Sequence, residues 1–239
     1  MKILILAAGR GTRISRYLSG NPKCTVDIGG GTRLIEYTID LLHSRGIRDI
    51  GIVLGYKAEV IREILGGKGV TFFYNPFYDV TNSIASCWFA KEFIGGDDLL
   101  IMNGDVYLED KLLDRILASE KSPVMFSDES RKETADYKFY YENGLLMKYG
   151  KDLAGEDITG EYIGIGRFAA EFLPEFVSRM EAMIDRQEHS VWWENVIYSM
   201  TEEQPVYVEN VSGHFWAEVD YIEDYERILE HRGVEKIVR

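Results

Sequence analysis

The sequence is short of cysteine, with only Cys24 and Cys87 among its 239 residues. Two thiols can form neither a disulfide framework nor a zinc site of several cysteines, so both of these classes are excluded. No stretch approaches the roughly 18 apolar residues of a membrane-spanning helix, and the run from Ile3 to Ala8 is too short for a signal peptide. We therefore expect a cytoplasmic protein without a membrane partner.

Basic residues are scarce relative to acidic ones. Lys and Arg number 27 against 40 Asp and Glu, which gives a formal net charge of −13. This balance argues against a broad nucleic-acid-binding surface and against binding to an anionic membrane. A small anionic substrate is still compatible, because a local group of cations or a bound metal ion reverses the field near it. Apolar residues make up 46% of the chain, which supplies a large core and excludes a disordered chain.

Apolar stretches of strand length alternate with helical patterns over the first half of the chain. Such alternation predicts right-handed βαβ units, and therefore parallel strands with helices on both faces of a sheet. The expected strands are 3–6, 50–54, 70–74 and 99–102, and the expected helices are 32–45, 58–65 and 83–93.

The pattern changes after about residue 130. Asn143-Gly144 lies between two strand-like stretches and supplies the positive φ angles of a tight hairpin turn. No repeat or linker separates the halves, so we expect one domain, 1–239, with a core of about 1–130 and a smaller α+β lobe of about 131–239. The expected fold is α/β, with a Rossmann-like, mixed but mostly parallel sheet flanked by helices. The later expected strands are 137–141, 145–149, 161–168, 206–211 and 215–219, and the helices are 169–185, 191–200 and 221–231.

A glycine-rich loop directly follows the first expected strand. Small residues allow a ligand to approach the backbone closely, and glycines allow N–H groups to converge on phosphate oxygens. Arg10, Arg13 and Lys23 add cations, which predicts an anion site, although a tight turn with solvated arginines is the alternative. Ile14 replaces the last glycine of a Rossmann fingerprint, and a P-loop motif is absent. The loop consists of Leu6, Ala7, Ala8, Gly9, Arg10, Gly11, Thr12 and Arg13.

Acidic side chains are associated with two of the expected strands. Asp105 comes just after the apolar stretch 99–102, at the sheet edge where ligands bind in open α/β folds. Glu218 and Asp220 alternate with apolar residues and so share one face of a late strand. Neighbouring carboxylates repel each other unless water or a cation separates them. A solvated strand face and a cation site are therefore both open interpretations.

The glycine loop, followed by Pro22-Lys23, resembles the signature of the sugar-nucleotidyltransferase-like superfamily of pyrophosphorylases. The resemblance extends over nearly the whole chain. It implies that the loop wraps a nucleoside triphosphate, with Gly9 and Gly11 under the nucleotide. It also implies that Arg13 and Lys23 contact the phosphates and act in catalysis. The first half of the chain then binds the nucleotide, and the second half binds the other substrate, the acceptor.

The same superfamily holds Mg²⁺ between an aspartate in a Gly-Asp turn and an aspartate on a late strand. Asp105 and Asp220 match these positions, so the resemblance implies that both are catalytic metal ligands, with Glu218 as an auxiliary ligand. Mg²⁺ takes few protein carboxylates and completes its shell with phosphates and water, so two or three acids are enough.

The segment from Tyr74 to Trp88 resembles the corresponding part of phosphocholine cytidylyltransferases and their relatives. Superfamily members that act on sugars usually carry a glutamine and a glycine-rich turn here, and this sequence departs from that pattern. The resemblance therefore implies CTP as the nucleotide. Asn82 and Ser83 are candidate nucleotide contacts, although polar residues at the start of a helix also serve as its cap.

Aromatic residues are frequent in the second half, and most are expected in the core. Trp192 and Trp193 are adjacent and cannot share one helix face, so one of them is expected to face a cleft. Such rings hold a quaternary ammonium group by cation–π contacts, whereas a primary amine favours the carboxylates that are also present. The resemblance places a lysine against the acceptor's phosphate, and Lys151 fits better than Lys148. The expected acceptor-binding residues are Tyr137, Lys151, Glu161, Trp192, Trp193, Glu194 and Glu218.

The resemblance implies a Mg²⁺-dependent cytidylyltransferase that transfers CMP from CTP to a small phosphate or phosphonate. Phosphocholine is the favoured acceptor, and the alternatives are 2-aminoethylphosphonate, phosphoethanolamine, an amino-acid-derived phosphate and inositol phosphate. Two other functions are open: a UTP- or dTTP-dependent pyrophosphorylase for a sugar 1-phosphate, and a non-catalytic nucleotide-binding module. No nucleic-acid partner is expected, and a homodimer is possible.

Overall fold

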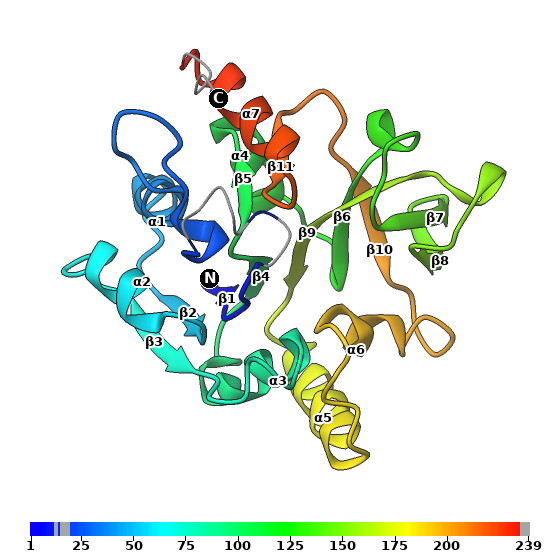
Figure 1. Cartoon of the computed structure of the whole chain (residues 1–239). Coiled ribbons are helices and arrows are strands. Elements are labelled where there is room, and N and C mark those ends of the chain that lie inside the picture. Colours follow the sequence, from blue (N-terminus) through cyan, green and yellow to red (C-terminus); the bar gives the residue numbers. More distant parts are fainter. Residues whose placement is uncertain (12–13, 15–19, 235–239) are drawn as a thin grey trace.

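The structure is a computed structural model that describes residues 1–11, 14 and 20–234 (Figure 1). Among these residues, the largest feature is a nine-stranded sheet with the order β3-β2-β1-β4-β9-β6-β10-β8-β7. A second, two-stranded sheet pairs β5 with β11. The strands are β1 (Lys2–Ala7), β2 (Ile50–Leu54), β3 (Thr71–Tyr74), β4 (Leu99–Asn103), β5 (Val106–Leu108), β6 (Val124–Asp128), β7 (Lys138–Glu142), β8 (Leu145–Gly150), β9 (Gly160–Phe168), β10 (Tyr207–Asn210) and β11 (Trp216–Glu218).

Helices flank the large sheet (Figure 1). The α-helices are α1 (Leu34–Ser44), α2 (Ala58–Ile64), α3 (Ser83–Phe89), α4 (Asp110–Leu117), α5 (Leu173–Asp185), α6 (Glu194–Tyr198) and α7 (Ile222–His231). Short 3₁₀ turns are η1 (Lys23–Thr25), η2 (Lys91–Phe93), η3 (Glu129–Arg131) and η4 (Gly155–Asp157).

Strand β1 shows why the first half of the sequence is so apolar. Ile3 and Ile5 belong to a buried cluster with residues of α1, α2 and α4. Leu4 and Leu6, which point the other way, belong to a second cluster with residues of α3, α5 and α6. A strand covered on both faces needs apolar residues at every position, so its sequence shows a continuous apolar run rather than alternation.

Strand β9 joins the two halves of the chain into one sheet. It lies between β4 and β6 and is antiparallel to both. Strands β1, β2, β3 and β4 are mutually parallel where they pair, as their intervening helices require. The structure therefore confirms the predicted α/β class with a mixed sheet. The later strands extend the sheet of the first half.

Three elements lie outside the predictions, namely β5, α4 and β6. Strand β5 has only three residues, and its partner β11 comes far later in the chain, with Val106 opposite Glu218. The backbone N–H of Val219 also donates to the carbonyl of Asp105 at 3.0 Å. This pairing brings together two acidic segments that are distant in sequence, and no local pattern could reveal it.

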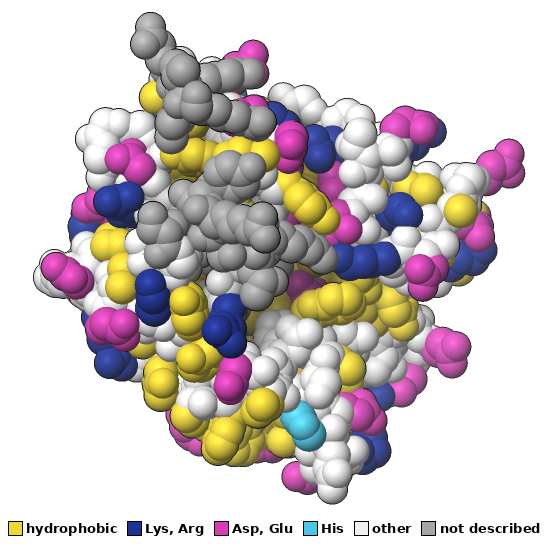
Figure 2. Space-filling view, in the orientation of Figure 1, with side chains coloured by type: hydrophobic (Ala, Val, Ile, Leu, Met, Phe, Trp, Pro, Cys, Tyr) yellow, Lys and Arg dark blue, Asp and Glu magenta, His cyan; other side chains and the backbone are white. Residues whose placement is uncertain are grey.

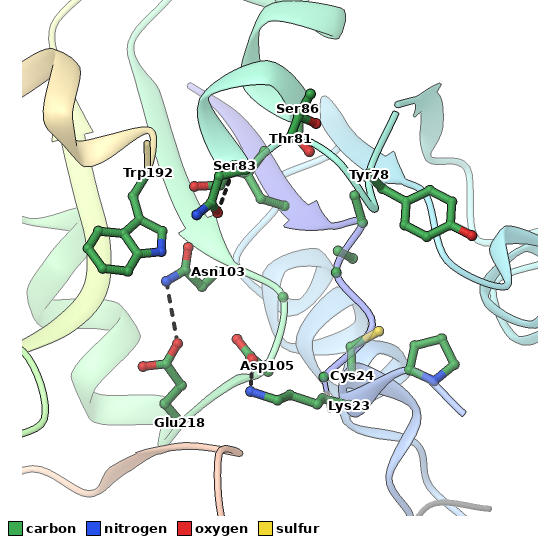
Figure 3. A pocket seen from close by; sticks show the side chains of 18 of the residues that line it. Lys23, Cys24, Tyr78, Thr81, Ser83, Ser86, Asn103, Asp105, Trp192 and Glu218 are labelled. Atoms are coloured by element: carbon green, nitrogen blue, oxygen red, sulfur yellow. Dashed lines mark hydrogen bonds and ion pairs between the residues drawn. The ribbon is translucent and has the colours of Figure 1, made fainter. Parts of the chain in front are cut away.

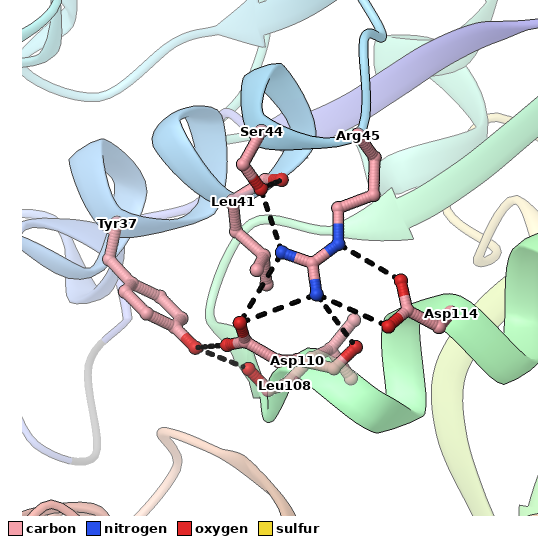
Figure 4. Close-up of polar contacts among 7 residues, drawn as sticks. All are labelled: Tyr37, Leu41, Ser44, Arg45, Leu108, Asp110 and Asp114. Carbon is pink, nitrogen blue, oxygen red and sulfur yellow. Dashed lines mark hydrogen bonds and ion pairs between the residues drawn. The ribbon is translucent and has the colours of Figure 1, made fainter.

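Arg45 anchors the segment that follows Asp105 (Figure 4). Its guanidinium donates to Asp114 at 2.9 Å and to Asp110 at 3.3 Å, both on α4. The Tyr37 hydroxyl donates to the carbonyl of Leu108 at 2.9 Å. Each ion pair is solvent-exposed on its acidic side and therefore contributes little to stability. Their effect is therefore mainly geometric, because they fix β5 and α4 against α1.

Several helix boundaries differ from the predicted ones by a few residues. The predicted helix 169–185 begins at Leu173, because Pro174 lacks an N–H group and is compatible only with the first turn. The predicted helix 191–200 is reduced to the five residues of α6. This shortening places Trp192 in the loop before the helix and Trp193 at its N-cap position.

The surface carries mixed charge. On the face shown in Figure 2, Lys and Arg side chains are scattered among Asp and Glu side chains and do not gather into a broad basic area. None of the helices in the described part of the chain combines the length and apolarity needed to cross a membrane.

Candidate active site

A first pocket lies at the carboxyl ends of β1 and β4 and has a volume of about 240 Å³ (Figure 3). The structure brings together at this pocket every described residue that the resemblance assigned to the nucleotide. Arg10, which was also expected at the anion site, does not line the pocket, and its guanidinium lies 5.4 Å from the centre of the Tyr56 ring. Arg13 lies outside the described residues. The predicted residues that line the pocket are Leu6, Ala7, Ala8, Gly9, Gly11, Lys23, Asn82, Ser83 and Asp105.

Two glycines allow the pocket wall to close. Gly11 has a φ of +60°, and a Cβ atom there would lie 2.4 Å from Cγ of Lys23. A Cβ atom on Gly104 would lie 2.9 Å from Cβ of Ala7. No larger residue fits either position without displacing its neighbour, because real Cβ contacts are longer. The glycine loop and the turn before Asp105 therefore depend on these glycines for their close approach.

Lys23 links the two predicted metal ligands. Its Nζ lies 3.1 Å from Asp105 Oδ2 and also forms an ion pair with Asp220 Oδ1. Burial disfavours the charged ammonium, but the charges of Asp105 and Asp220 outweigh burial and raise the pKa of Lys23. One stable positive charge thus sits between two carboxylates that β5 and β11 bring together.

The arrangement of these acids fits a divalent cation. Asp105 and Asp220 already converge on one cationic atom, and Glu218 stands nearby, 3.5 Å from the amide nitrogen of Asn103. Carboxylate oxygens are the ligands that Mg²⁺ prefers, and the ion needs only one or two of them. Among residues 1–11, 14 and 20–234, no three or more His, Cys, Asp or Glu side chains form a ready-made metal cluster. Two or three carboxylates leave positions in the shell of such an ion for phosphate and water ligands.

A second pocket of about 450 Å³ adjoins the first. Lys23, Glu194 and Glu218 line both pockets, whereas Asp105 lines the first and Asp220 the second. The paired aspartates thus stand at the boundary between two ligand-sized spaces. The predicted acceptor residues that line the second pocket are Tyr137, Lys151, Glu161, Trp192, Glu194 and Glu218.

The two adjacent tryptophans have different environments. Trp192 is 42% exposed and lines both pockets, as expected of one member of the pair. Trp193 is fully buried and lines neither, so its prediction as an acceptor contact is wrong. Its indole N–H donates to Asn103 Oδ1 at 3.2 Å, and its backbone N–H donates to Ser83 Oγ at 2.9 Å. A Cβ atom on Gly166 would lie 3.0 Å from its ring, so Gly166 provides the space that this ring occupies.

Lys151, rather than Lys148, borders the second pocket. The Lys151 ammonium pairs with Asp136 at 2.7 Å and lies 5.8 Å from the centre of the Trp192 ring. Lys148 instead pairs with Asp157 at 2.7 Å and does not line the pocket. The geometry thus agrees with the preference for Lys151 over Lys148. Contact between Lys151 and the acceptor's phosphate stays a prediction.

Two of the predicted contacts also have structural partners. Asn82 Oδ1 accepts from the N–H of Ser83 at 2.8 Å and so caps α3. Glu161 accepts from Nε of Arg131 at 2.5 Å and from the N–H of Asp136 at 2.8 Å. These bonds fix both side chains at the pocket walls, and their contact with a ligand stays a prediction.

Glu194 is the most unusual side chain of the second pocket. It is only 5% exposed, and its Oε2 has no hydrogen-bond partner among the described residues. Burial raises the pKa of this carboxyl to about 7. A buried carboxyl with one oxygen left without a hydrogen bond is costly to the fold, which is typical of residues retained for function.

Sequence reasoning assigned no ligand contact to four residues that line the second pocket: Asn103, Asp136, Tyr162 and Tyr198. Two of them carried a usable signal. Tyr198 follows Glu194 by four residues on one helix face, and Asn103 directly precedes the predicted Gly-Asp turn. Tyr162 and Asp136 reach the pocket through the placement of β9 and of the loop before β7, which local spacing does not reveal.

Replacement of Glu194 tests its burial without an activity assay. A raised carboxyl pKa means that the folded state holds the proton more tightly than the unfolded chain does. The stability of the wild-type protein therefore falls as pH rises from about 4.5 through about 7. We expect Glu194→Gln to be more stable than wild type by roughly 3 kcal/mol at pH 8 and roughly 1 kcal/mol at pH 5. Urea denaturation at both pH values measures this difference in the free energy of unfolding. An equal difference at pH 5 and pH 8 would contradict a raised pKa of Glu194.

A mixed α/β sheet with a glycine loop and paired aspartates at one edge defines a nucleotidyltransferase. The chain belongs to the family of MobA-like NTP transferase domains, whose family model matches residues 3–239. This membership confirms the superfamily predicted from the glycine loop and identifies the protein as an enzyme of the nucleotidyltransferase class.

Relatives span nearly the whole chain. The CTP:phosphoglutamine cytidylyltransferase of Campylobacter jejuni subsp. jejuni is 29% identical over 259 residues, covering 96% of this chain and 100% of the relative. The choline-phosphate cytidylyltransferase of Streptococcus pneumoniae is 28% identical over 239 residues, covering 96% and 97%. A solved structure of the CTP:phosphocholine cytidylyltransferase from Streptococcus pneumoniae matches with a TM-score of 0.79 at 25% identity, covering 97% of this chain and 98% of that chain. These similarities confirm the predicted phosphocholine cytidylyltransferase-like branch.

Proposed function

We propose that this protein is a metal-dependent cytidylyltransferase that transfers CMP from CTP to a small phosphate or phosphonate and releases pyrophosphate. The observation that carries the proposal is the convergence of Asp105 and Asp220 on one cation, Nζ of Lys23, where the two pockets meet. A reaction between two substrates needs their reacting groups to be held together at such a boundary. CTP as the nucleotide is supported by the names of the three relatives described above, each of which is a cytidylyltransferase.

The chain's own groups position the reactants. Loop N–H groups next to Gly9 and Gly11, together with the Lys23 ammonium, bind and orient the triphosphate in the first pocket. An acceptor oxygen attacks the α-phosphorus in line, the new P–O bond forms, and the bond to pyrophosphate breaks with its electron pair leaving on pyrophosphate. This oxygen is already anionic near neutral pH, so no general base is required. Mg²⁺ held by Asp105 and Asp220 would supply charge neutralisation at the α-phosphate.

The charge of the second pocket favours an acceptor with a cationic end. Two ammonium groups, of Lys23 and Lys151, line it, and both are already paired with carboxylates. A positive head group would relieve the excess of negative charge, while the acceptor's phosphate lies toward Lys23. The carboxylates that line the second pocket, among the described residues, are Asp136, Glu161, Glu194, Glu218 and Asp220. Phosphocholine, phosphoethanolamine and 2-aminoethylphosphonate all carry a cationic head group at one end and a phosphate or phosphonate at the other.

A nucleotide and acceptor panel tests the proposed function. With Mg²⁺ we expect pyrophosphate release that requires both CTP and an amine-bearing acceptor, with the CDP-linked product identified by mass spectrometry. UTP, dTTP and ATP should support at least about 10-fold slower turnover, and EDTA should stop it. Turnover of UTP or dTTP with a sugar 1-phosphate would indicate the sugar-type activity instead. Tight CTP binding with no turnover of any acceptor would indicate a regulatory module.

A further inference from the structure

Three buried polar groups without partners line the second pocket. They are Oε2 of Glu194 and the hydroxyls of Tyr162 and Tyr198, and none forms a hydrogen bond of good geometry with a described residue. The Tyr162 hydroxyl lies near Glu194 and the Tyr198 hydroxyl near Tyr137, without completing such a bond. The three side chains are 5%, 6% and 2% exposed. Native proteins satisfy nearly all buried polar groups, and each one left unsatisfied destabilises the fold. Such a concentration at one pocket indicates that a ligand or ordered water supplies the missing bonds.

The ring faces of the two tyrosines are already in use. Tyr198 stacks on Tyr149 with a centroid distance of 4.1 Å and on Tyr137 with a distance of 6.0 Å. Tyr162 stacks on Phe139 at 5.0 Å. A cage for a quaternary ammonium group needs open aromatic faces. These two residues instead leave their hydroxyls without partners, which suits a ligand that forms hydrogen bonds.

Glu194 supplies the negative charge next to these hydroxyls. The Tyr162 hydroxyl lies near the Glu194 carboxyl, and burial, followed by the charge of Glu194, raises the pKa of Tyr162. A ligand that displaces water from these groups gains affinity only if it replaces the hydrogen bonds of that water. A primary ammonium carries three N–H donors for this purpose, whereas a quaternary ammonium carries none.

We propose that the second pocket selects an acceptor whose head group is a primary ammonium, which donates hydrogen bonds to Glu194, Tyr162 and Tyr198. The inference deepens the proposed function and rests on it for the reaction in which the acceptor is used. It revises the preference for phosphocholine that the sequence resemblance implies. Because five carboxylates line the pocket among the described residues, a head group that also carries a carboxylate is disfavoured by charge repulsion.

A methylation series isolates the N–H donors. Phosphoethanolamine, its N-methyl and N,N-dimethyl derivatives and phosphocholine share one phosphate, one spacer and one positive charge, and they lose one N–H at each step. We expect kcat/KM to fall along the series, with phosphocholine about 100-fold below phosphoethanolamine. Phosphocholine turned over as fast as phosphoethanolamine, or faster, would overturn the inference.

Conservative variants separate selection from structural support. Tyr162→Phe and Tyr198→Phe remove one hydroxyl each, so they should lower kcat/KM for phosphoethanolamine about 10-fold and that for phosphocholine by a clearly smaller factor, about 2-fold. Tyr149→Phe is the matched control, because Tyr149 stacks on Tyr198 but does not line the pocket. A uniform loss for all acceptors in the two pocket variants would show a merely structural role and contradict the proposal.

Binding measurements keep this inference separate from the proposed function. Calorimetry with CDP-ethanolamine and CDP-choline compares the head groups without turnover, and CDP-ethanolamine should bind about 100-fold more tightly. If no acceptor in the series releases pyrophosphate, the proposed function fails. If the series is turned over but CDP-choline binds equally well or better, only the selectivity for a primary ammonium fails.

Discussion

Replacement of Asp105 or Asp220 by asparagine is expected to lower kcat by two to four orders of magnitude while the protein stays folded. Asparagine keeps the size of the side chain but removes the negative charge that holds Lys23 now and would hold a divalent ion. Loss of charge stabilisation at a transferring phosphoryl group typically costs about 10²–10⁴ in rate. Pyrophosphate release at saturating CTP and acceptor measures kcat, and circular dichroism with thermal unfolding monitors the fold.

Asp185→Asn is the matched control for this experiment. Asp185 is an exposed residue in the last turn of α5 and lines neither pocket, so the same chemical change there should leave kcat within about twofold. If Asp105→Asn and Asp220→Asn unfold the protein, both acids are structural. If they fold and retain full turnover, the site has been placed wrongly.

Lys23→Met is expected to give the second-largest effect, and it has two parts. Methionine fills the space of the lysine stem but leaves Asp105 and Asp220 facing each other without a cation. Loss of one partner from a mostly buried ion pair costs about 3–5 kcal/mol when nothing compensates, so Tm without metal should fall by several degrees. Turnover with CTP should fall about 10²–10³-fold, because the ammonium that orients the triphosphate is gone.

The dependence of Tm on Mg²⁺ distinguishes this account from a general packing defect. Mg²⁺ should raise the Tm of Lys23→Met more than that of wild type, since the ion takes the place between the carboxylates that Lys23 otherwise fills. Thermal unfolding with and without millimolar Mg²⁺ gives both shifts. Equal shifts in the two proteins would mean that Lys23 does not occupy the cation's place.

The first half of the fold could be predicted because its signals are local. Strand 50–54 is fully buried, so an apolar run with glycine-bounded helices around it was enough to fix its bounds. Strand β5 could not be predicted, because three residues form a strand only through pairing with β11. The start of α5 was predicted too early because the helical spacing of apolar residues continues back to residue 169. Pro174 is compatible only with the first turn of a helix, so α5 begins at Leu173.

The candidate site divides in the same way. Gly9, Gly11 and Lys23 lie within one short stretch and could be found together from spacing. Asp105 and Asp220 were linked only by resemblance, because the contact between them depends on β5, β11 and Lys23. Trp193 was misassigned because its burial depends on space beside Gly166, on another element. Tyr162 and Tyr198 look in sequence like ordinary core aromatics, and only their hydroxyls without partners set them apart.

The central claim is that Asp105 and Asp220 hold a divalent cation against the α-phosphate of CTP. A crystal structure of the protein with CTP and Mn²⁺, with the metal located by its anomalous scattering, tests it most directly. The account predicts an anomalous peak bonded to both carboxylates and to an α-phosphate oxygen, with the Lys23 ammonium moved from between the aspartates onto the triphosphate. A metal peak that contacts neither aspartate, with Lys23 still bridging them, would contradict it.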